Sequence, residues 1–202
     1  AESGAEVVAL CDTNGGMLPA QVADVVRDVI DSTGARVGIH CHNDTGCAVA
    51  NSMAAVDAGA THVQGTVNGY GERTGNANIL TLVSNLQIKQ GMPLLEPARL
   101  REATRISHAI SEVTNVPPYS RQPYVGASAF AHKAGLHASA LKVDPDLYQH
   151  TDPAFVGNSM RTLVSDMAGR ASIELKAKEM GVDLTDQSEL VAAVLAEVKE
   201  LE

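Results

Sequence analysis

The chain has 202 residues, of which 45% are hydrophobic, enough for one substantial core or for a core plus a small appendage. Its formal net charge of −9 argues against a nucleic acid or an anionic membrane as partner, because both repel an acidic surface. No apolar run approaches the length of a membrane span, and three cysteines, an odd number, indicate a reducing cytoplasm rather than a disulfide scaffold.

Residues 1–92 predict three successive strand–loop–helix units of similar size. We expect strands at 6–11, 35–42 and 62–67, each followed by a helix: one from about Pro19, one carrying Val49 to Val56, and one carrying Ile79 to Leu86. Such repeats imply a parallel sheet, either doubly wound or closed as a (β/α)₈ barrel. Polar residues follow all three strands, and no Gly-x-Gly-x-x-Gly follows the first, so the α/β barrel is favoured. Three units cannot close it, so we expect the last three units of a longer protein.

Beyond residue 92 the pattern changes to small, mostly helical subdomains. Prolines flank a helix with Leu100, Ile106, Ile110 and Val113, which indicates a helical linker subdomain at 93–127. A second subdomain at 128–184 is expected to hold helices at 128–141 and 167–180, with a turn at 144–146. An amphipathic helix is expected at 185–202, and it ends abruptly on charge, as if a following segment were missing.

The stretch from Gly38 to Asp44 is the most informative, because it reads as a strand ending in a loop that carries two histidines. Side chains alternate along a strand, so His40 and His42 share one face and Cys41 points to the other. Two imidazoles at the end of a parallel strand can bind a divalent metal. The alternative is a pair of histidines satisfied by hydrogen bonds, and two ligands are too few for a catalytic metal.

Three segments occur in an order that resembles a known family: 12–15 (DTNG), 40–44 (HCHND) and 68–77 (NGYGERTGNA). They resemble the metal-dependent acyl-CoA Claisen synthases, which include isopropylmalate, homocitrate and citramalate synthases, with HMG-CoA lyase as a more distant relative. Segments 130–137 and 148–153 are most similar to the long-form citramalate synthases. The resemblance covers the whole chain, and it implies that the helix at 185–202 leads towards a regulatory domain that this chain lacks. The family's early arginine–aspartate motif and its catalytic glutamate do not occur here, so we expect the chain alone to be inactive.

The resemblance implies a metal site at His40 and His42, with Asn76 adding an amide oxygen. Zn²⁺, Mn²⁺ and Mg²⁺ all remain open. The alternative role of Asn76 is a helix N-cap. Thr13 is expected to bind the carboxylate of the acceptor substrate, and its alternative is a turn residue or helix cap.

Glu72 and Arg73 lie in the glycine-flanked loop above the expected metal. The functional interpretation is that Glu72 orients a catalytic group, while Arg73 steadies the loop or an anionic ligand; the alternative is a solvated ion pair of little value. The family brings a histidine and a tyrosine across a dimer interface, and His137 and Tyr148 match them. Packing is the alternative for His137, and His132 is a nearby rival.

The implied activity is an acyltransferase reaction of acetyl-CoA with a 2-oxo acid, pyruvate being favoured, in a cytoplasmic homodimer. Isopropylmalate synthase and homocitrate synthase are alternatives within the class, and a lyase running the reverse cleavage is a weaker one. A different class also stays open, in which the chain is a non-catalytic dimerisation module, because a partial barrel exposes strand edges.

Overall fold

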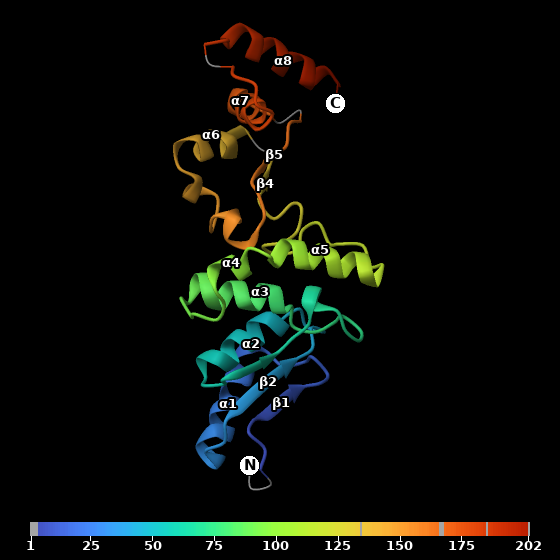
Figure 1. The fold of residues 1–202 in the computed structure, drawn as a ribbon, viewed down its shortest axis with the longest axis vertical. Coiled ribbons are helices and arrows are strands. Elements are labelled where there is room, and N and C mark those ends of the chain that lie inside the picture. The colour runs from blue at the N-terminus through green and yellow to red at the C-terminus, as the bar shows by residue number, and fades with distance from the viewer. Residues whose placement is uncertain (1–3, 134, 166–167, 185, 202) are drawn as a thin grey trace. The chain divides into compact units, whose positions relative to one another are not determined.

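The structure is a computed structural model that describes residues 4–133, 135–165, 168–184 and 186–201. The chain forms two compact units (Figure 1). Unit 1 comprises Ala1–Arg99 and Arg105–Pro118, and unit 2 comprises Leu100–Thr104 and Tyr119–Glu202. The subdomain boundaries expected at 92, 127 and 184 stay a prediction.

Unit 1 contains the predicted βα repeats. Strands β1 (Val8–Asp12), β2 (Val37–Cys41) and β3 (His62–Gln64) form a parallel sheet in the order β1-β2-β3. Helices α1 (Pro19–Thr33) and α2 (Ala48–Asp57) pack against each other and against β2, and they cover one face of the sheet (Figure 1). Helix α3 (Ile79–Ser84) continues as a π-helical turn, η2 (Asn85–Lys89).

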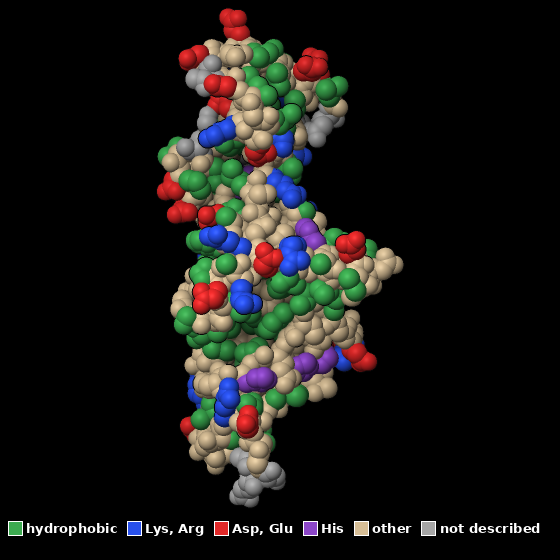
Figure 2. Space-filling model, in the orientation of Figure 1, with side chains coloured by type: hydrophobic (Ala, Val, Ile, Leu, Met, Phe, Trp, Pro, Cys, Tyr) green, Lys and Arg blue, Asp and Glu red, His purple; other side chains and the backbone are tan. Residues whose placement is uncertain are grey.

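The alternation of side chains in the sheet separates a core face from a polar face. Val37, Ile39 and Cys41 are buried in the core, together with Val26 and Leu82 from the helices. In a parallel sheet, registered neighbours share a face, so Cys11, His40 and Gln64 lie side by side on the opposite one. Histidine side chains come to the surface in the region of β1 and β2 (purple in Figure 2).

Two strands end earlier than predicted. Strand β3 ends at Gln64 and not at residue 67, because the Thr66 N–H donates to the Ala77 carbonyl instead of to a neighbouring strand. Strand β2 ends at Cys41, and His42 forms an isolated bridge with Asn76. Both departures draw the chain towards the loop at residues 68–76.

The single helix expected around Leu100 to Val113 is two helices, α4 (Pro97–Leu100) and α5 (Ala103–Thr114). The break falls at Arg101 and Glu102. There Gly157 packs so closely on the Arg101 carbonyl that a Cβ at position 157 would overlap it. The Thr104 hydroxyl also donates to the Val156 carbonyl, so residues 100–104 are held by unit 2.

Unit 2 is mostly helical around a short parallel pair of strands, β4 (Ala131–His132) and β5 (Arg161–Thr162). Its helices are α6 (Gly135–Val143), α7 (Arg170–Glu179) and α8 (Ser188–Leu201), with 3-10 turns η3 (Pro145–Leu147) and η4 (Pro153–Val156). In unit 1 the short 3-10 turn η1 spans Val67–Gly69. None of the helices in the described ranges combines the length and apolarity of a membrane span.

The helix predicted at 128–141 is wrong in its first part, because Ala131 and His132 are a strand. The Arg161 N–H donates to the Phe130 carbonyl and the Leu163 N–H to the His132 carbonyl, a pairing with a segment remote in sequence. The helix predicted from Met167 starts at Arg170, and Met167 itself lies outside the described residues. The last helix begins at Ser188, while Thr185 and Glu202 also lie outside the described residues.

Candidate metal and substrate site

The two histidines predicted to bind metal lie together at the carboxyl end of β2. The ring centroids of His40 and His42 are 5.3 Å apart in an edge-on arrangement. Each Nδ1 is buried, and neither has a hydrogen-bond partner among the described residues. Leaving such a nitrogen unsatisfied costs about 1–3 kcal/mol, so the pair is suited to a ligand that both rings can reach. A cation with open coordination positions meets that requirement.

Cys41, between the histidines, points into the core and is fully buried. Burial raises the pKa of its thiol to about 11, because desolvation disfavours the thiolate. The thiol is therefore neutral near pH 7, and Cys41 serves packing rather than nucleophilic chemistry.

Asn76 completes the set of three predicted ligands. Its side-chain Nδ2 lies 3.0 Å from Nε2 of His40, and the adjacent Ala77 N–H donates to the Cys41 carbonyl at 3.0 Å. The alternative N-cap role is wrong for Asn76, because Asn78 caps α3 by accepting from the Leu80 N–H at 3.1 Å. The amide of Asn76 is therefore left to face the histidine.

The donor set of this site is two imidazoles and one amide. Among the residues that the structure describes, no group of three or more His, Cys, Asp or Glu side chains could hold a metal ion. The residues present fit a divalent cation in part, through the unsatisfied imidazole nitrogens. A carboxylate ligand would have to join them.

The loop at 68–76 is shaped by backbone-to-backbone packing that only glycine permits. A Cβ at Gly71 would overlap the side-chain oxygen of Asn76. Gly75 has φ +94°, and a Cβ there would overlap the Gly69 carbonyl. The loop thus presses directly on the predicted ligand Asn76.

Helix α5 anchors the start of this loop. The Asn68 amide donates to the Ser107 carbonyl at 2.9 Å, and the Ser107 hydroxyl donates to the Asn68 Oδ1 at 2.6 Å. The Tyr70 hydroxyl lies 3.1 Å from the Ser111 hydroxyl. These contacts fix the start of the loop to α5.

Arg73 binds to two other loops through its guanidinium. Nε donates to Asp44 Oδ1 at 2.8 Å, while Nη2 donates to Asp44 Oδ2 at 2.9 Å and to the Thr13 carbonyl at 2.8 Å. The hydrogen bond from Arg73 holds the pKa of the Asp44 carboxyl below its usual value. This partnership was missed from sequence. The one hint in the sequence is that Asp44 and Arg73 each lie within three residues of a predicted metal ligand, in the loops after neighbouring strands.

Thr13 and Glu72 take different places. Thr13 is exposed and lines an open hollow of about 760 Å³ together with Cys11, Asp12, Asn14, Met17, Asp44 and Arg73. Glu72 is exposed on the glycine loop, where its carbonyl accepts from the Gly75 N–H at 2.9 Å. The proposed substrate role of Thr13 fits this open position, and the role of Glu72 stays a prediction.

In unit 2 the structure brings His137 and Tyr148 together. His137 lies on α6 and Tyr148 follows η3, and their rings stack with centroids 4.1 Å apart. The ring of His132, on β4, meets His137 edge-on at 6.1 Å. Burial lowers the pKa of His132, and the neighbouring charge of His137 lowers it further. His132 therefore lies beside the pair, and its place as the nearby rival of His137 stays a prediction.

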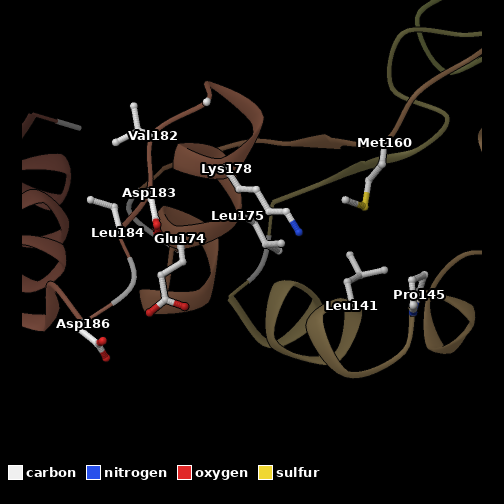
Figure 3. A pocket seen from close by; sticks show the side chains of 11 residues that line it. Leu141, Pro145, Met160, Glu174, Leu175, Lys178, Val182, Asp183, Leu184 and Asp186 are labelled. Carbon is white, nitrogen blue, oxygen red and sulfur yellow. The ribbon is translucent and has the colours of Figure 1, made fainter.

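Unit 2 also contains a hollow of about 880 Å³ that includes none of the predicted site residues. Leu175 and Lys178 extend from α7 towards Leu141 and Met160, while Glu174 lies nearer the other end (Figure 3). Its mixture of aliphatic and charged side chains does not define a chemistry.

Parallel βα units with polar side chains just beyond the strands define part of a (β/α)₈ barrel. A family model described as HMGL-like matches residues 1–110, and one described as homocitrate synthase post-HMGL domain-like matches 124–202. The chain belongs to the HMGL-like family. This confirms the family and the fold class predicted from the sequence, a partial barrel followed by small helical subdomains.

Curated relatives match the chain over its whole length. (R)-Citramalate synthase of Streptomyces coelicolor is 69% identical over 100% of this chain and 38% of the relative. (R)-Citramalate synthase of Synechocystis sp. is 47% identical over the same shares. Probable 2-isopropylmalate synthase of Methanopyrus kandleri is 38% identical over 99% of this chain and 39% of the relative. The chain therefore spans about 38% of the length of the first two relatives.

Two solved structures resemble part of this chain in fold. HMG-CoA lyase of Bacillus subtilis superposes with a TM-score of 0.50 at 28% identity, covering 59% of this chain and 42% of that one. HMG-CoA lyase of Acinetobacter baumannii, solved with coenzyme A and 3-methylmalate, gives a TM-score of 0.51 at 24% identity over 59% and 41%. The second likeness supports the fold alone.

Proposed function

We propose that this chain is part of an acyltransferase that condenses acetyl-CoA with a 2-oxo acid, pyruvate being favoured and (R)-citramalate the product. The observation that carries the proposal is the convergence of His40, His42 and Asn76, with two buried imidazole nitrogens that have no partner in the described part of the chain. The names of the relatives support the choice of acceptor. A cytoplasmic location is part of the same proposal.

His40, His42 and Asn76 would hold a divalent cation, Zn²⁺, Mn²⁺ or Mg²⁺. Such an ion supplies Lewis-acid stabilisation of negative charge on an acceptor oxygen. Thr13 is suited to bind the carboxylate of the acceptor, since it lines the hollow in unit 1. Glu72 would orient a catalytic group from the glycine loop.

In a homodimer, the stacked pair of His137 and Tyr148 would act on the acetyl group of the acetyl-CoA that the partner subunit binds. A base removes a proton from the acetyl methyl group, and the resulting carbanion attacks the ketone carbon to form the new C–C bond. The π electron pair of the ketone moves to its oxygen, which takes up a proton to become the hydroxyl of the product. Water then hydrolyses the thioester and releases CoA. We assign to the pair the transfer of protons at the acetyl and thioester groups.

The test uses the full-length parent protein with acetyl-CoA and three separate acceptors: pyruvate, 2-oxoisovalerate and 2-oxoglutarate. CoA release is followed by thiol titration, and the product is identified by chiral chromatography. We expect release to be fastest with pyruvate and the product to be (R)-citramalate. Preference for either other acceptor would reassign the substrate within the family, and no release with any acceptor would refute the activity.

A second candidate, a dimerisation module without catalysis, is favoured by one observation. Among the described residues, β1 and β3 each pair with β2 alone, so both edges of the sheet are open to another chain. This candidate predicts that the 202-residue chain self-associates. A chain that elutes as a monomer in size-exclusion chromatography with light scattering, across a range of concentrations, would rule the module out.

A further inference from the structure

The loops that follow β1, β2 and β3 meet at one guanidinium. We propose that Arg73 and Asp44 are positioning residues that hold the predicted metal ligands in register, by joining these three loops. We call the guanidinium of Arg73, the carboxylate of Asp44 and the carbonyl of Thr13 the Arg73 clamp. The inference rests on the proposed metal site and assigns no contact between the clamp and the metal.

The contacts of the Arg73 clamp form a fork that a lysine could not reproduce. Two parallel N–H···O bonds of 2.8 and 2.9 Å join Arg73 to Asp44, and a third of 2.8 Å joins it to the Thr13 carbonyl. A bidentate arginine–carboxylate pair fixes direction as well as distance. The fork therefore sets the spacing between loops.

The backbone around the clamp is adapted to it. Arg73 has φ +56°, in the left-handed region that residues other than glycine rarely adopt, and such strain persists only where neighbouring contacts impose it. Gly15 packs against Asp44 so closely that a Cβ at position 15 would overlap the carboxylate. The absence of a side chain at Gly15 leaves room for the Asp44 carboxylate, and the backbone of Arg73 adopts an unfavourable conformation where it binds that carboxylate.

The clamp is linked to the predicted ligands by short stretches of chain. Asp44 lies two residues after His42, and Arg73 lies three residues before Asn76. The Asn43 N–H donates to the Gly75 carbonyl at 2.9 Å, which ties the same two loops a second time. A shift of Arg73 relative to Asp44 would therefore move Asn76 relative to His42.

The clamp should affect metal affinity far more than stability. The side chains of Arg73 and Asp44 are 43% and 26% exposed, and ion pairs of that exposure contribute little to the free energy of unfolding. Residues that support a metal ligand from outside the coordination sphere often change metal affinity by about 10–100-fold. A variant that loses metal affinity but little free energy of unfolding therefore indicates a positioning role, and an ordinary surface ion pair would change neither quantity much.

The experiment measures Co²⁺ binding by visible absorption in the full-length parent and in R73K, D44N and the double variant. We expect each single variant to lose about tenfold or more in Co²⁺ affinity, with little change in melting temperature. The double variant should lose no more Co²⁺ affinity than either single variant, because each change breaks the same arginine–carboxylate pair. R27K is the matched control, since Arg27 pairs with Asp24 at 3.0 Å on the exposed surface of α1.

Unchanged Co²⁺ affinity in R73K and D44N would overturn the proposal, and so would a loss shared by R27K. If the unaltered parent bound no Co²⁺, the proposed metal site would fail, and the clamp would be judged by amide hydrogen exchange. Faster exchange at residues 43–46 and 72–76 in R73K would then support the clamp, and unchanged exchange would refute it.

Discussion

Cys11 on β1 and Cys41 on the neighbouring strand β2 differ in exposure because their side chains face opposite sides of the sheet. Cys11 is exposed on the polar face, next to His40 in the register. Cys41, one residue along β2, is fully buried on the core face. The difference follows from the period of two along a strand and not from the identity of the residues.

This difference predicts selective alkylation of the cysteines. At pH 8 iodoacetamide should modify Cys11 quickly and Cys41 at least about a hundredfold more slowly. The pKa of about 11 leaves very little thiolate at Cys41, and burial removes access. Peptide mass spectrometry over time measures both rates, and a denatured sample should show them equalised. Comparable rates in the folded chain would contradict the burial of Cys41.

Because the pKa of His132 is lowered, we expect unit 2 to lose stability when the pH falls. The pKa of this histidine is lowered in the folded chain, chiefly by burial. As the pH falls through the ordinary value of about 6.5, the unfolded chain binds a proton that the folded chain does not, and unfolding becomes easier. Urea titrations at pH 7.5 and 5.5 measure the difference in free energy of unfolding.

H132F should reduce that difference, because it keeps a ring but removes the titrating group. H108F, at an exposed position on α5 in unit 1, is the control. An equal pH effect in the parent chain and in H132F would show that other groups account for it.

At the scale of elements, the glycine loop at residues 68–76 leaves no space for a side chain at position 71. Gly71 does not need a left-handed backbone, so its requirement is space alone, next to the Asn76 amide. Gly34, at the C-cap of α1, has φ +62° and open space around it. The two positions allow steric and conformational effects to be separated.

G71A should push Asn76 away from His40 and weaken Co²⁺ binding by the full-length parent, with a loss of about 1–3 kcal/mol in the free energy of unfolding. G34A should lower stability through backbone strain and leave Co²⁺ affinity as it was. Absorption titration and thermal melting measure the two quantities. A G71A variant that binds Co²⁺ as tightly as the parent would show that Asn76 does not serve the metal.

The sequence predicted those elements whose information is local. Apolar periodicity placed α1, α2 and the three parallel strands, and the alternation in β2 placed both histidines on one face. It could not place β4, a strand of two residues whose partner β5 lies far along the chain. It also could not reveal the Arg73 clamp, since charges beside glycines look the same whether solvated or paired across loops.

At the scale of the whole molecule, each unit has a buried core of its own. Leu82 of α3 is fully buried among the helices and strands of unit 1, and Leu141 of α6 is buried in unit 2. Two cores in one chain are expected to respond separately to loss of packing.

L82A and L141A should each cost about 2–5 kcal/mol, and each should accelerate amide exchange chiefly in its own unit. Hydrogen exchange followed by mass spectrometry would show α1 and α2 affected by the first variant and α7 and α8 by the second. Uniform acceleration along the chain by either variant would indicate one cooperative unit instead.

One contact of the Arg73 clamp has a consequence for protein engineering. Arg73 binds the carbonyl oxygen of Thr13, an atom that every amino acid supplies, and the Thr13 side chain is left facing the hollow. Residue 13 can therefore be randomised while the loop spacing is retained. If Thr13 binds the acceptor as proposed, a library at this one position can change the acceptor preference without breaking the hydrogen bond from Arg73.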